Sequence, residues 1–498
     1  MKKIFFIITI SIISSTLIYS QSVYVDNALK FSTNDYGGTA RFVGMGGAFG
    51  ALGGDQSSIV INPAGLGVYR GSEIIFSPGM SYNSNSSTYI NNNIDENGYA
   101  VNLNNIGFVA SYDLENSDTR WVNFNFAVSL NRTSDLNNDI HFQGVNNSSL
   151  METFINQANA TTSDPYELDG LYEFLIWDAY IMDYDTVLNE FYSEITDAVI
   201  NDPSNFEIYQ RKIIKTEGSI SEFNFAFGGN YAHKLYIGAS IGITRLRYEE
   251  YASHYERETS GLPISFIDAF EFKERSSSEG TGFTFKFGAI YKPIEFVRLG
   301  ASFHLPTFYN IDQEFYNEAY GDFESFNADG SISPVQTYEY ELYTPLRAVG
   351  SVGFQIGKFA LIDIDYEYAD YSTMQLGDEF NDQNGIIQDN SDIKAIFQET
   401  HNLRAGAEFR FGSLYLRGGG RYSPSPFKKI DGVSTSDYNK ITLSGGLGYR
   451  EKNFFIDFAF AQTSSSYKIS AYEYEYNTEE ASIDNKLNNF ILTFGFKF

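Results

Sequence analysis

The chain has 498 residues, a formal net charge of −29 and no cysteine. The lack of cysteine excludes disulfides, thiolate metal sites and cysteine nucleophiles, and the acidic balance argues against nucleic acid or an anionic lipid surface as a partner. Acidic external loops facing cation-bridged lipopolysaccharide agree with this charge, and so does a surface whose charge only confers solubility. Phe and Tyr, with 44 and 37 residues, make up nearly all of the 17% aromatic content, an excess that aromatic girdles at two membrane interfaces explain.

Residues 1–20 have the composition of a secretory signal peptide. Lys2 and Lys3 precede an apolar run that continues to about Tyr19, and cleavage is expected after Ser20. Hydroxyl residues interrupt the run, which falls short of the roughly 20 apolar residues of a transmembrane helix. Because no cysteine is present for lipid attachment, the sequence predicts an exported protein without a lipid anchor.

Residues 41–67, RFVGMGGAFGALGGDQSSIVINPAGLG, are nearly free of charge and rich in glycine. They lie just before the first predicted strand, which is where a plug inside a barrel would have to lie. Pro63 fixes its own φ and favours an extended Asn62, and Gly65 permits an unusual backbone angle after it. The segment therefore predicts a rigid kink that can seat against a barrel wall.

This segment resembles the N-terminal hatch of the FadL/TodX family, outer-membrane channels for long-chain fatty acids and other hydrophobic compounds. The matching residues are Gly44-Met45-Gly46-Gly47-Ala48, Asp55 and Asn62-Pro63-Ala64; over the rest of the chain the resemblance is architectural. It implies a plug formed by residues 21–70, and a sideways exit for the ligand at an inward kink of the third strand, here near 120–133. The implied gating residues are Gly44, Gly46, Gly47, Asn62, Pro63, Ala64 and Gly65.

From Gly71 to the last residue, apolar and polar side chains alternate outside the loops. Most alternating runs reach about 10 residues, the length of a tilted transmembrane strand. Short connections alternate with long ones such as 84–98, 134–216, 251–278 and 309–336, an asymmetry typical of outer-membrane barrels. The sequence therefore predicts an all-β fold, a transmembrane antiparallel β-barrel of about 14 strands over residues 71–498. The strands are expected near 71–83, 99–113, 120–133, 217–232, 234–250, 279–291, 295–308, 337–355, 358–372, 399–411, 413–424, 438–450, 453–466 and 485–498.

Residues 134–216 depart from the alternation. From Asp164 onward, apolar residues recur three and four positions apart, and Asp164-Pro165 is a favourable helix start. One or two amphipathic helices are therefore expected in an extracellular loop, and the FadL/TodX family uses helical loops on this side to form an apolar entry groove. The residues expected to meet a hydrophobic ligand first are Phe174, Leu175, Trp177, Tyr180 and Ile181. A helix face that only packs on the barrel rim is the alternative, and it is the more common role of such a face.

Charged side chains recur on one face of the strands between residues 360 and 424. Facing lipid, an arginine would cost about 2–4 kcal/mol at mid-bilayer, so these side chains should point into the lumen. The predicted lumenal charge network comprises Asp363, Asp365, Glu367, Arg404, Glu408, Arg410, Arg417 and Arg421. Its members can pair with one another and hold the plug, or an arginine can bind a ligand carboxylate; pairing is the preferred interpretation.

The sequence supports no catalytic, metal or cofactor site. Gly238-Ala239-Ser240-Ile241-Gly242 fits the G-x-S-x-G pattern, but it lies inside a continuing strand and lacks the strand–turn–helix context of a nucleophile elbow. Its small residues are expected to make room for a plug or a ligand. The five histidines show no paired metal spacing.

Two functions fit these features. The first is passive uptake of hydrophobic small molecules across the outer membrane, by a monomer in contact with lipid and lipopolysaccharide. The second is protein secretion or surface attachment, because barrels similar to FadL serve as shuttles in type IX secretion. An enzyme is not expected, since no hydrolase constellation is present. Phe498 ends an aromatic strand, which is expected to be read as an assembly signal by the barrel-assembly machinery as well as to close the barrel.

Overall fold

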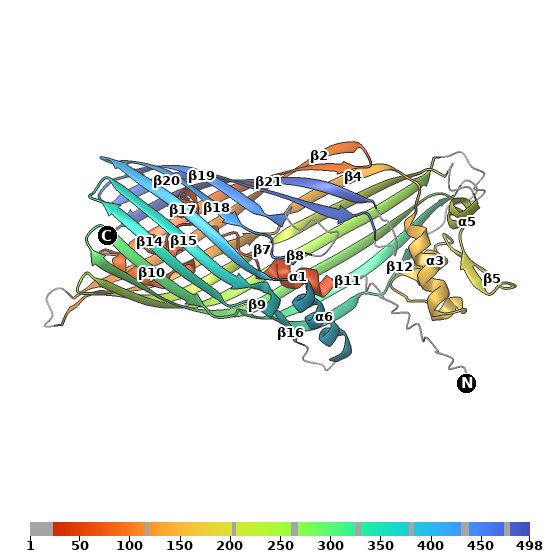
Figure 1. The fold of residues 1–498 in the computed structure, drawn as a ribbon, viewed down its shortest axis with the longest axis horizontal. Helices are drawn as coiled ribbons and strands as arrows, with labels where there is room; N and C mark the ends of the chain where they lie inside the picture. The colour runs from red at the N-terminus through yellow and green to blue at the C-terminus, as the bar shows by residue number, and fades with distance from the viewer. Residues whose placement is uncertain are drawn as a thin grey trace, which may run out of the picture.

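The computed structural model describes residues 23–114, 119–201, 206–259, 267–323, 330–377, 383–429, 438–472 and 479–498. They form one elongated β-barrel, with the C-terminus at one end and a small helical cap at the other (Figure 1). The predicted signal peptide, residues 1–20, lies outside the described residues. Within the described ranges, no helix combines the length and the apolarity needed to cross a membrane.

Fourteen antiparallel spans build the barrel wall. The first strand pairs with the last, from Glu73 opposite Lys497 to Thr88 opposite Ser482, and this pairing closes the sheet. Some spans consist of two strand segments separated by a short break: β3 with β4, β10 with β11, β13 with β14, and β15 with β16. The strands are β1 (Glu73–Tyr89), β2 (Asn92–Asp113), β3 (Trp121–Asp135), β4 (Asn138–Asn146), β7 (Ile208–Tyr231), β8 (Leu235–Glu258), β9 (Ile267–Ile294), β10 (Val297–His304), β11 (Phe308–Phe323), β12 (Ser331–Ile332), β13 (Gln336–Tyr343), β14 (Arg347–Ile356), β15 (Ala360–Asp370), β16 (Gln375–Gly377), β17 (Glu399–Phe411), β18 (Leu414–Ser423), β19 (Lys440–Arg450), β20 (Phe454–Ser470) and β21 (Glu480–Lys497).

Each predicted strand corresponds to a span of the barrel, so the predicted fold class is confirmed. The predicted long loop 84–98 is wrong. Strands β1 and β2 continue through it to a two-residue turn, Ile90-Asn91, whose φ angles are both positive, 43° and 61°. The extension is polar on both faces, so it lacks the alternation that identifies a half-buried strand in a sequence. Strands β7, β8 and β9 also extend further toward the cap than predicted, to 24, 24 and 28 residues.

The outer wall divides into an apolar belt and a polar extension toward the cap. On β7, the outward-facing Phe223, Phe225 and Phe227 are exposed, and the next outward residues toward the cap are Ser221 and Ser219. The belt has the composition of a lipid-facing surface. On β7 its upper limit is sharp, because Phe223 and Ser221 are successive outward-facing residues.

The lumen holds two separate bodies from the N-terminal segment. The plug consists of α2 (Ala40–Gly44), η1 (Gln56–Val60) and η2 (Pro63–Val68), and these elements are buried. Helix α1 (Val23–Ser32), which belongs to the predicted hatch 21–70, lies nearer the cap beside α6 (Gln383–Ile396) (Figure 1). It packs in an aromatic cluster of its own, close to η4 (Tyr371–Thr373), and not on the plug.

The cap covers the end of the barrel opposite the C-terminus. It comprises α3 (Leu150–Thr161), η3 (Pro165–Glu167), α4 (Glu173–Asp178), the hairpin of β5 (Asp183–Asp185) and β6 (Glu190–Tyr192), and α5 (Glu194–Asn201). The one or two helices predicted from Asp164 onward correspond to α4 and α5, but Asp164-Pro165 starts only the 3-10 turn η3. Gly170 disfavours a continuous helix from this turn into α4. Helix α3 was not predicted, although Ser149-x-x-Glu152 at its start fits the capping-box pattern.

Candidate functional site

The candidate site consists of the plug, the wall on which it sits, and a gap in the wall beside it. Asn62 has an extended backbone and begins the 3-10 helix η2: its Oδ1 accepts a hydrogen bond from the Ala64 N–H at 3.1 Å, and its Nδ2 donates to the Gly50 carbonyl at 2.7 Å. The predicted rigid kink is therefore present. Gly65, however, has an ordinary φ; it is needed because a Cβ there would lie 2.6 Å from Ser58 Oγ.

A ring of glycines on the inner wall receives the plug. Eight of the nine consecutive spans from β7 to β19, all but that of β15 with β16, carry an inward-facing glycine that touches plug backbone or a plug side chain. On most of these eight, a Cβ would come closer than 3.0 Å to plug atoms. The eight are Gly228, Gly238, Gly288, Gly300, Gly353, Gly406, Gly419 and Gly446. Since real Cβ atoms do not approach so closely, these positions fix how deep the plug sits in the barrel. We call this ring the glycine seat.

On the plug side, Gly46 and Gly47 have positive φ, 65° and 74°, which glycine adopts without steric cost. They turn the chain after α2 so that the Met45 and Gly46 backbone lies against Gly419 of the seat. Gly44 also faces the wall, where a Cβ would lie 3.3 Å from the Gly446 Cα. Of the predicted gating glycines, Gly44 and Gly46 therefore lie directly against the wall, whereas Gly65 packs on Gly53 and Ser58 within the plug.

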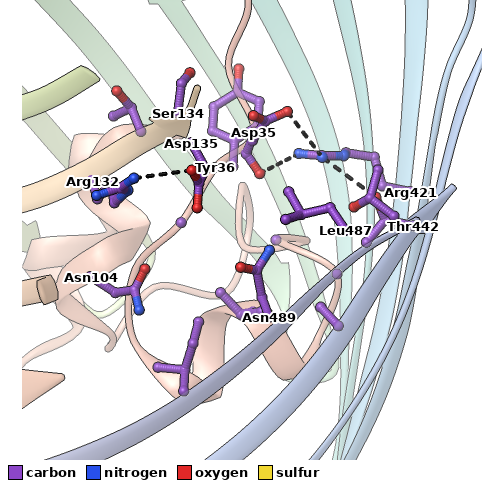
Figure 2. Close-up of a pocket in the computed structure, with 18 residues that line it drawn as sticks. Asp35, Tyr36, Asn104, Arg132, Ser134, Asp135, Arg421, Thr442, Leu487 and Asn489 are labelled. Carbon is purple, nitrogen blue, oxygen red and sulfur yellow. Dashed lines mark hydrogen bonds and ion pairs between the residues drawn. The ribbon is translucent and has the colours of Figure 1, made fainter. Parts of the chain in front are cut away.

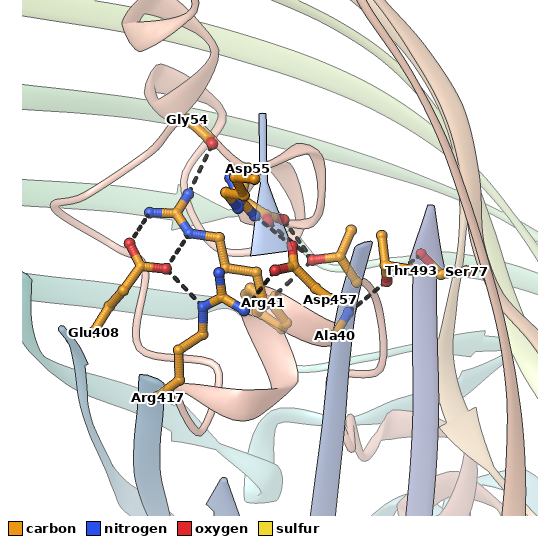
Figure 3. A network of polar contacts seen from close by, with 12 residues as sticks. Ala40, Arg41, Gly54, Asp55, Ser77, Glu408, Arg417, Asp457 and Thr493 are labelled. Carbon is orange, nitrogen blue, oxygen red and sulfur yellow. Dashed lines mark hydrogen bonds and ion pairs between the residues drawn. The ribbon is translucent and has the colours of Figure 1, made fainter. Parts of the chain in front are cut away.

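One buried ion network ties the plug to three strands (Figure 3). Arg41 of α2 donates to both carboxylate oxygens of Glu408 at 2.8 and 2.9 Å. Glu408 also accepts from Arg417 at 2.6 Å, and Arg417 donates to Asp457 at 2.8 Å. Removing one partner of a buried pair typically costs about 3–5 kcal/mol, since the other charge is left uncompensated. The network therefore strongly disfavours release of α2.

A second network lies around Glu367. This carboxylate accepts from Arg404 and Arg347, each at 2.9 Å, and from the Tyr36 hydroxyl at 2.6 Å. Next to it, Asp365 accepts hydrogen bonds from the Phe49 and Gly50 amides. Asp363 similarly accepts from the Ala51 amide at 3.1 Å. These wall carboxylates satisfy plug N–H groups that would otherwise be buried without partners.

All of the predicted lumenal charges except Arg410 belong to these networks or contact the plug segment. Arg421 is buried and donates to the Asp35 carbonyl at 2.6 Å, so it also contacts the plug segment. Arg410 does not belong to the network: it is exposed at the end of β17, where its Nε donates to the Gly412 carbonyl. It shares the inward parity of Arg404 and Glu408, but it lies beyond the level at which the plug fills the lumen.

The wall beside the plug has a gap between β2 and β3. The two strands pair only from Asn105 opposite Asn131 to Asp113 opposite Asn123, so residues 92–103 of β2 pair with β1 alone. The separation begins at irregularities in both strands, where Asn104 has no partner on β1 and Thr133 has none on β7. Beyond this point the third span leaves β2, as the inward kink implied by the family resemblance requires.

The plug segment takes the place that β2 vacates. The Thr133 carbonyl accepts hydrogen bonds from the Asp35 and Tyr36 amides at 2.9 and 3.1 Å. Gly37 lies so close to the Arg132 carbonyl that a side chain could not fit between them. A cavity of about 50 Å³ lies at this point, lined by Tyr36, Asn104 and Thr133 among others (Figure 2). It has room for about four waters at roughly 10–15 Å³ each. The sideways path between β2 and β3 is therefore closed in this structure.

The five residues expected at a ligand entry groove have different environments. Leu175 and Ile181 are 1% and 3% exposed and belong to the apolar core of the cap, so the prediction that they meet a ligand first is wrong for this conformation. Phe174 and Trp177 are partly buried against that core, and their ring centroids lie 5.6 Å apart with the ring planes tilted by 52°. Tyr180 is 65% exposed. The alternative interpretation, an apolar face that packs on the barrel rim, fits Leu175 and Ile181, since their cluster includes Phe270 and Phe272 of β9.

Ser240 lies within β8, which continues for many residues on both sides, so no nucleophile elbow is formed. Gly238 of the same motif belongs to the glycine seat, where it packs on Pro63 and Ala64. The expectation that these small residues make room for a plug is therefore confirmed at Gly238. Among the described residues, no group of three His, Asp or Glu side chains could hold a metal ion.

No protein-family model matches the sequence, and no curated protein is similar to it. Solved structures are similar over nearly the whole chain. The Pseudomonas putida toluene transporter TodX is 13% identical, with 93% of this chain and 99% of that chain covered and a TM-score of 0.54. A Pseudomonas aeruginosa FadL homologue is 12% identical, with 93% and 98% covered and a TM-score of 0.54. The chain has the fold of the FadL/TodX channels. The resemblance seen in the hatch residues is thus confirmed at the level of the fold.

Within this FadL/TodX fold, some plug contacts could not be anticipated. Arg41, Arg347 and Asp457 complete the ion networks but were not among the predicted charges. Arg41 did carry a signal, since it is the only cation within residues 41–67, whose one other charged residue is Asp55. The glycine seat had a signal too, a glycine at an inward position of consecutive strands, but recognising it requires the register between strands.

Proposed function

We propose that the protein is an outer-membrane channel for passive uptake of hydrophobic small molecules, gated by the plug and emptied sideways between β2 and β3. The solved proteins of the same fold include a toluene transporter and a FadL homologue, which supports an apolar ligand, either monoaromatic or like a long-chain fatty acid. An apolar ligand gains about 25 cal/mol for each Å² removed from water, so it would partition into an apolar groove without an energy source.

The observation that best supports this function is the position of the gap. Outward-facing apolar residues of β2 lie on both sides of Asn104: Tyr99, Val101 and Leu103 toward the cap, and Ile106 and Phe108 toward the C-terminal end. The gap therefore begins within an outward-facing apolar run of β2, and on the β3 side it begins next to Arg132, which lies opposite Ser221 just above the apolar residues of β7. A ligand that leaves here enters the bilayer directly and avoids the polar surface below the plug.

The plug supplies the gate. Its amides at Asp35 and Tyr36 occupy the β3 edge at the gap, and its α2 closes the lumen at the same level. Withdrawal of residues 35–37 would free the Thr133 carbonyl and enlarge the cavity beside Asn104. One movement would then connect the lumen to the lipid.

A substitution that fills the cavity tests this exit. Asn104→Phe places an apolar ring inside the wall at the gap, whereas Leu103→Phe, its neighbour, points outward and is the matched control. Uptake of N-phenyl-1-naphthylamine by cells producing each variant reports flux. We expect Asn104→Phe to lose uptake and Leu103→Phe to retain it. Normal uptake by a correctly inserted Asn104→Phe variant would refute the lateral exit.

Membrane placement requires export and insertion. We propose that residues 1–20 act as the signal peptide and that the barrel-assembly machinery recognises the last strand, β21, with Phe498. The Phe498 backbone pairs with Ser72 next to the first strand, so this end also completes barrel closure. We further propose that the protein acts as a monomer, because the pairing of β1 with β21 leaves no open sheet edge at the barrel seam.

A second candidate, protein secretion or surface attachment, is supported by the cap. No lysine or arginine occurs between Thr133 and Gln210, and Val187 and Leu188 are 86% and 66% exposed at the tip of the β5–β6 hairpin. An acidic surface with exposed apolar residues fits a protein partner as well as a small ligand. Native mass spectrometry of protein extracted from its own membrane separates the two: a bound apolar molecule favours transport, and a stoichiometric protein with an empty lumen favours secretion.

A further inference from the structure

A row of polar side chains crosses the outer wall directly above the apolar belt. Ser221 on β7 lies opposite Arg245 on β8, Arg245 lies opposite Thr281 on β9, and Thr281 lies opposite Asn310 on β11. We call these four residues the polar row. Two positions along each strand toward the C-terminal end, the corresponding row is wholly apolar: Phe223, Ile243, Phe283 and Phe308.

The polar row is free of carboxylates. It offers one guanidinium, two hydroxyls and one amide, and none of the four side chains makes a hydrogen bond or ion pair with another described residue. The chain has a net charge of −29, and on the same wall Arg132, Arg247 and Arg275 are each paired with a carboxylate. Arg132, which continues the row on β3, is one of these, since it lies 3.1 Å from Asp135.

Carboxylates begin one row nearer the cap. There Arg247 faces Glu279 across the sheet and donates to Glu249 at 2.7 Å, and Asp312 lies opposite Glu279. From the apolar belt toward the cap, three successive rows therefore differ in composition. The first is apolar, the second carries one cation and neutral hydrogen-bond donors, and the third contains a cation and carboxylates. A surface that only had to be soluble would have no reason to keep its acids out of the first polar row.

We propose that the polar row binds the phosphate of a lipid headgroup in the outer leaflet. An unpaired guanidinium keeps its fork of donors for an oxyanion, which arginine binds in bidentate fashion, and the hydroxyl and amide groups of the same row add donors. The acyl chains of the same lipid would lie along the apolar row below. This apolar neighbour distinguishes a lipid from a free anion, which the acidic protein as a whole repels. The inference rests on the proposed location of the protein in the outer membrane, but not on the proposed transport.

The test uses the full-length protein in detergent and native mass spectrometry. The probe is diphosphoryl lipid A, compared with the same glycolipid after removal of both phosphates and with inorganic phosphate. Arg245→Gln removes the charge but keeps a polar side chain. Arg257→Gln is the matched control, because Arg257 is also exposed on β8 but lies near the cap, over the Tyr209 ring. Twelve residues at roughly 3.3 Å each separate the two positions.

We expect lipid A to bind about tenfold more weakly to Arg245→Gln, the loss typical for hydrogen bonds to a charged group. Arg257→Gln should bind lipid A as the unmodified protein does, and Arg245→Lys should recover part of the affinity. Equal binding by Arg245→Gln and Arg257→Gln would overturn the proposal. So would inorganic phosphate that displaces lipid A, since the site would then hold a free anion. Uptake of N-phenyl-1-naphthylamine by Arg245→Gln should be normal, so a failure of the transport function would be seen separately.

Discussion

The glycine seat predicts that one methyl group can unseat the plug. A Cβ on Gly419 would lie closer than 3.0 Å to the Met45 carbonyl carbon and oxygen and to the Gly46 nitrogen, all of them backbone atoms that cannot rotate away. A Cβ on Gly418, its neighbour on β18, would point to the opposite face and have no atom within 4 Å. The two substitutions Gly419→Ala and Gly418→Ala therefore make the same chemical change on the two sides of one strand.

Overpacking of this kind costs about 1–3 kcal/mol. If the barrel stays intact, the added methyl group destabilises only the state in which the plug is seated. A destabilisation of that size lowers the ratio of seated to unseated plug by about 5- to 150-fold. Amide hydrogen exchange measures the ratio directly. Peptides that cover residues 40–54 should exchange faster by that factor in Gly419→Ala, while exchange in the belt strands should not change. Equal plug exchange in the two variants would refute the argument that the seat fixes the plug.

Three further outcomes follow from the contacts described. Arg41→Met leaves Glu408 with one arginine fewer in a buried site, so the plug should lose about 3–5 kcal/mol of stability, measurable as faster exchange of α2 amides. Asn62→Ala removes the cap of η2 and should cost about 0.5–2 kcal/mol, seen as faster exchange of residues 63–68 and increased uptake of N-phenyl-1-naphthylamine. In the cap, burial raises the pKa of Glu173, so the protonated form is favoured in the folded state. The stability of α4 should therefore be greatest at low pH and fall as the pH rises through the raised pKa; proteolysis of the cap should show this slope, and Glu173→Gln should abolish it.

The barrel could be predicted because its physical signal is local. In a strand of the belt, every second residue must meet an apolar surface. The last strand shows this with Phe490, Leu492, Phe494 and Phe496, and such an alternation is visible in any single strand. Beyond the belt the inner face of β1 is buried but mostly polar, with Asn83, Asn85 and Ser87, so the hairpin over 83–97 is regular without showing an apolar–polar alternation. The strand ends in this region were therefore placed too early.

The site was predicted less completely because its contacts are between distant segments. The hatch motif pointed to the correct residues, but Arg41 meets Glu408 over 367 positions of sequence. Arg404 and Arg410 have the same parity on β17, and only the depth of the plug separates the buried one from the exposed one. Likewise, the spacing of Leu175 and Ile181 shows that they share an apolar face, but whether that face meets a ligand or a protein core depends on what packs on it.

The most direct test of the channel is to lock the plug to the wall. A Cβ on Gly44 would lie 3.6 Å from the Ala459 Cβ, which is within the range of about 3.5–4.5 Å for a disulfide, and the chain has no cysteine of its own. Cells producing the double variant Gly44→Cys, Ala459→Cys should take up N-phenyl-1-naphthylamine only after reduction, while each single variant should be insensitive to reductant. Equal uptake by the oxidised and reduced double variant, with the disulfide verified by mass spectrometry, would contradict a channel that opens by movement of its plug.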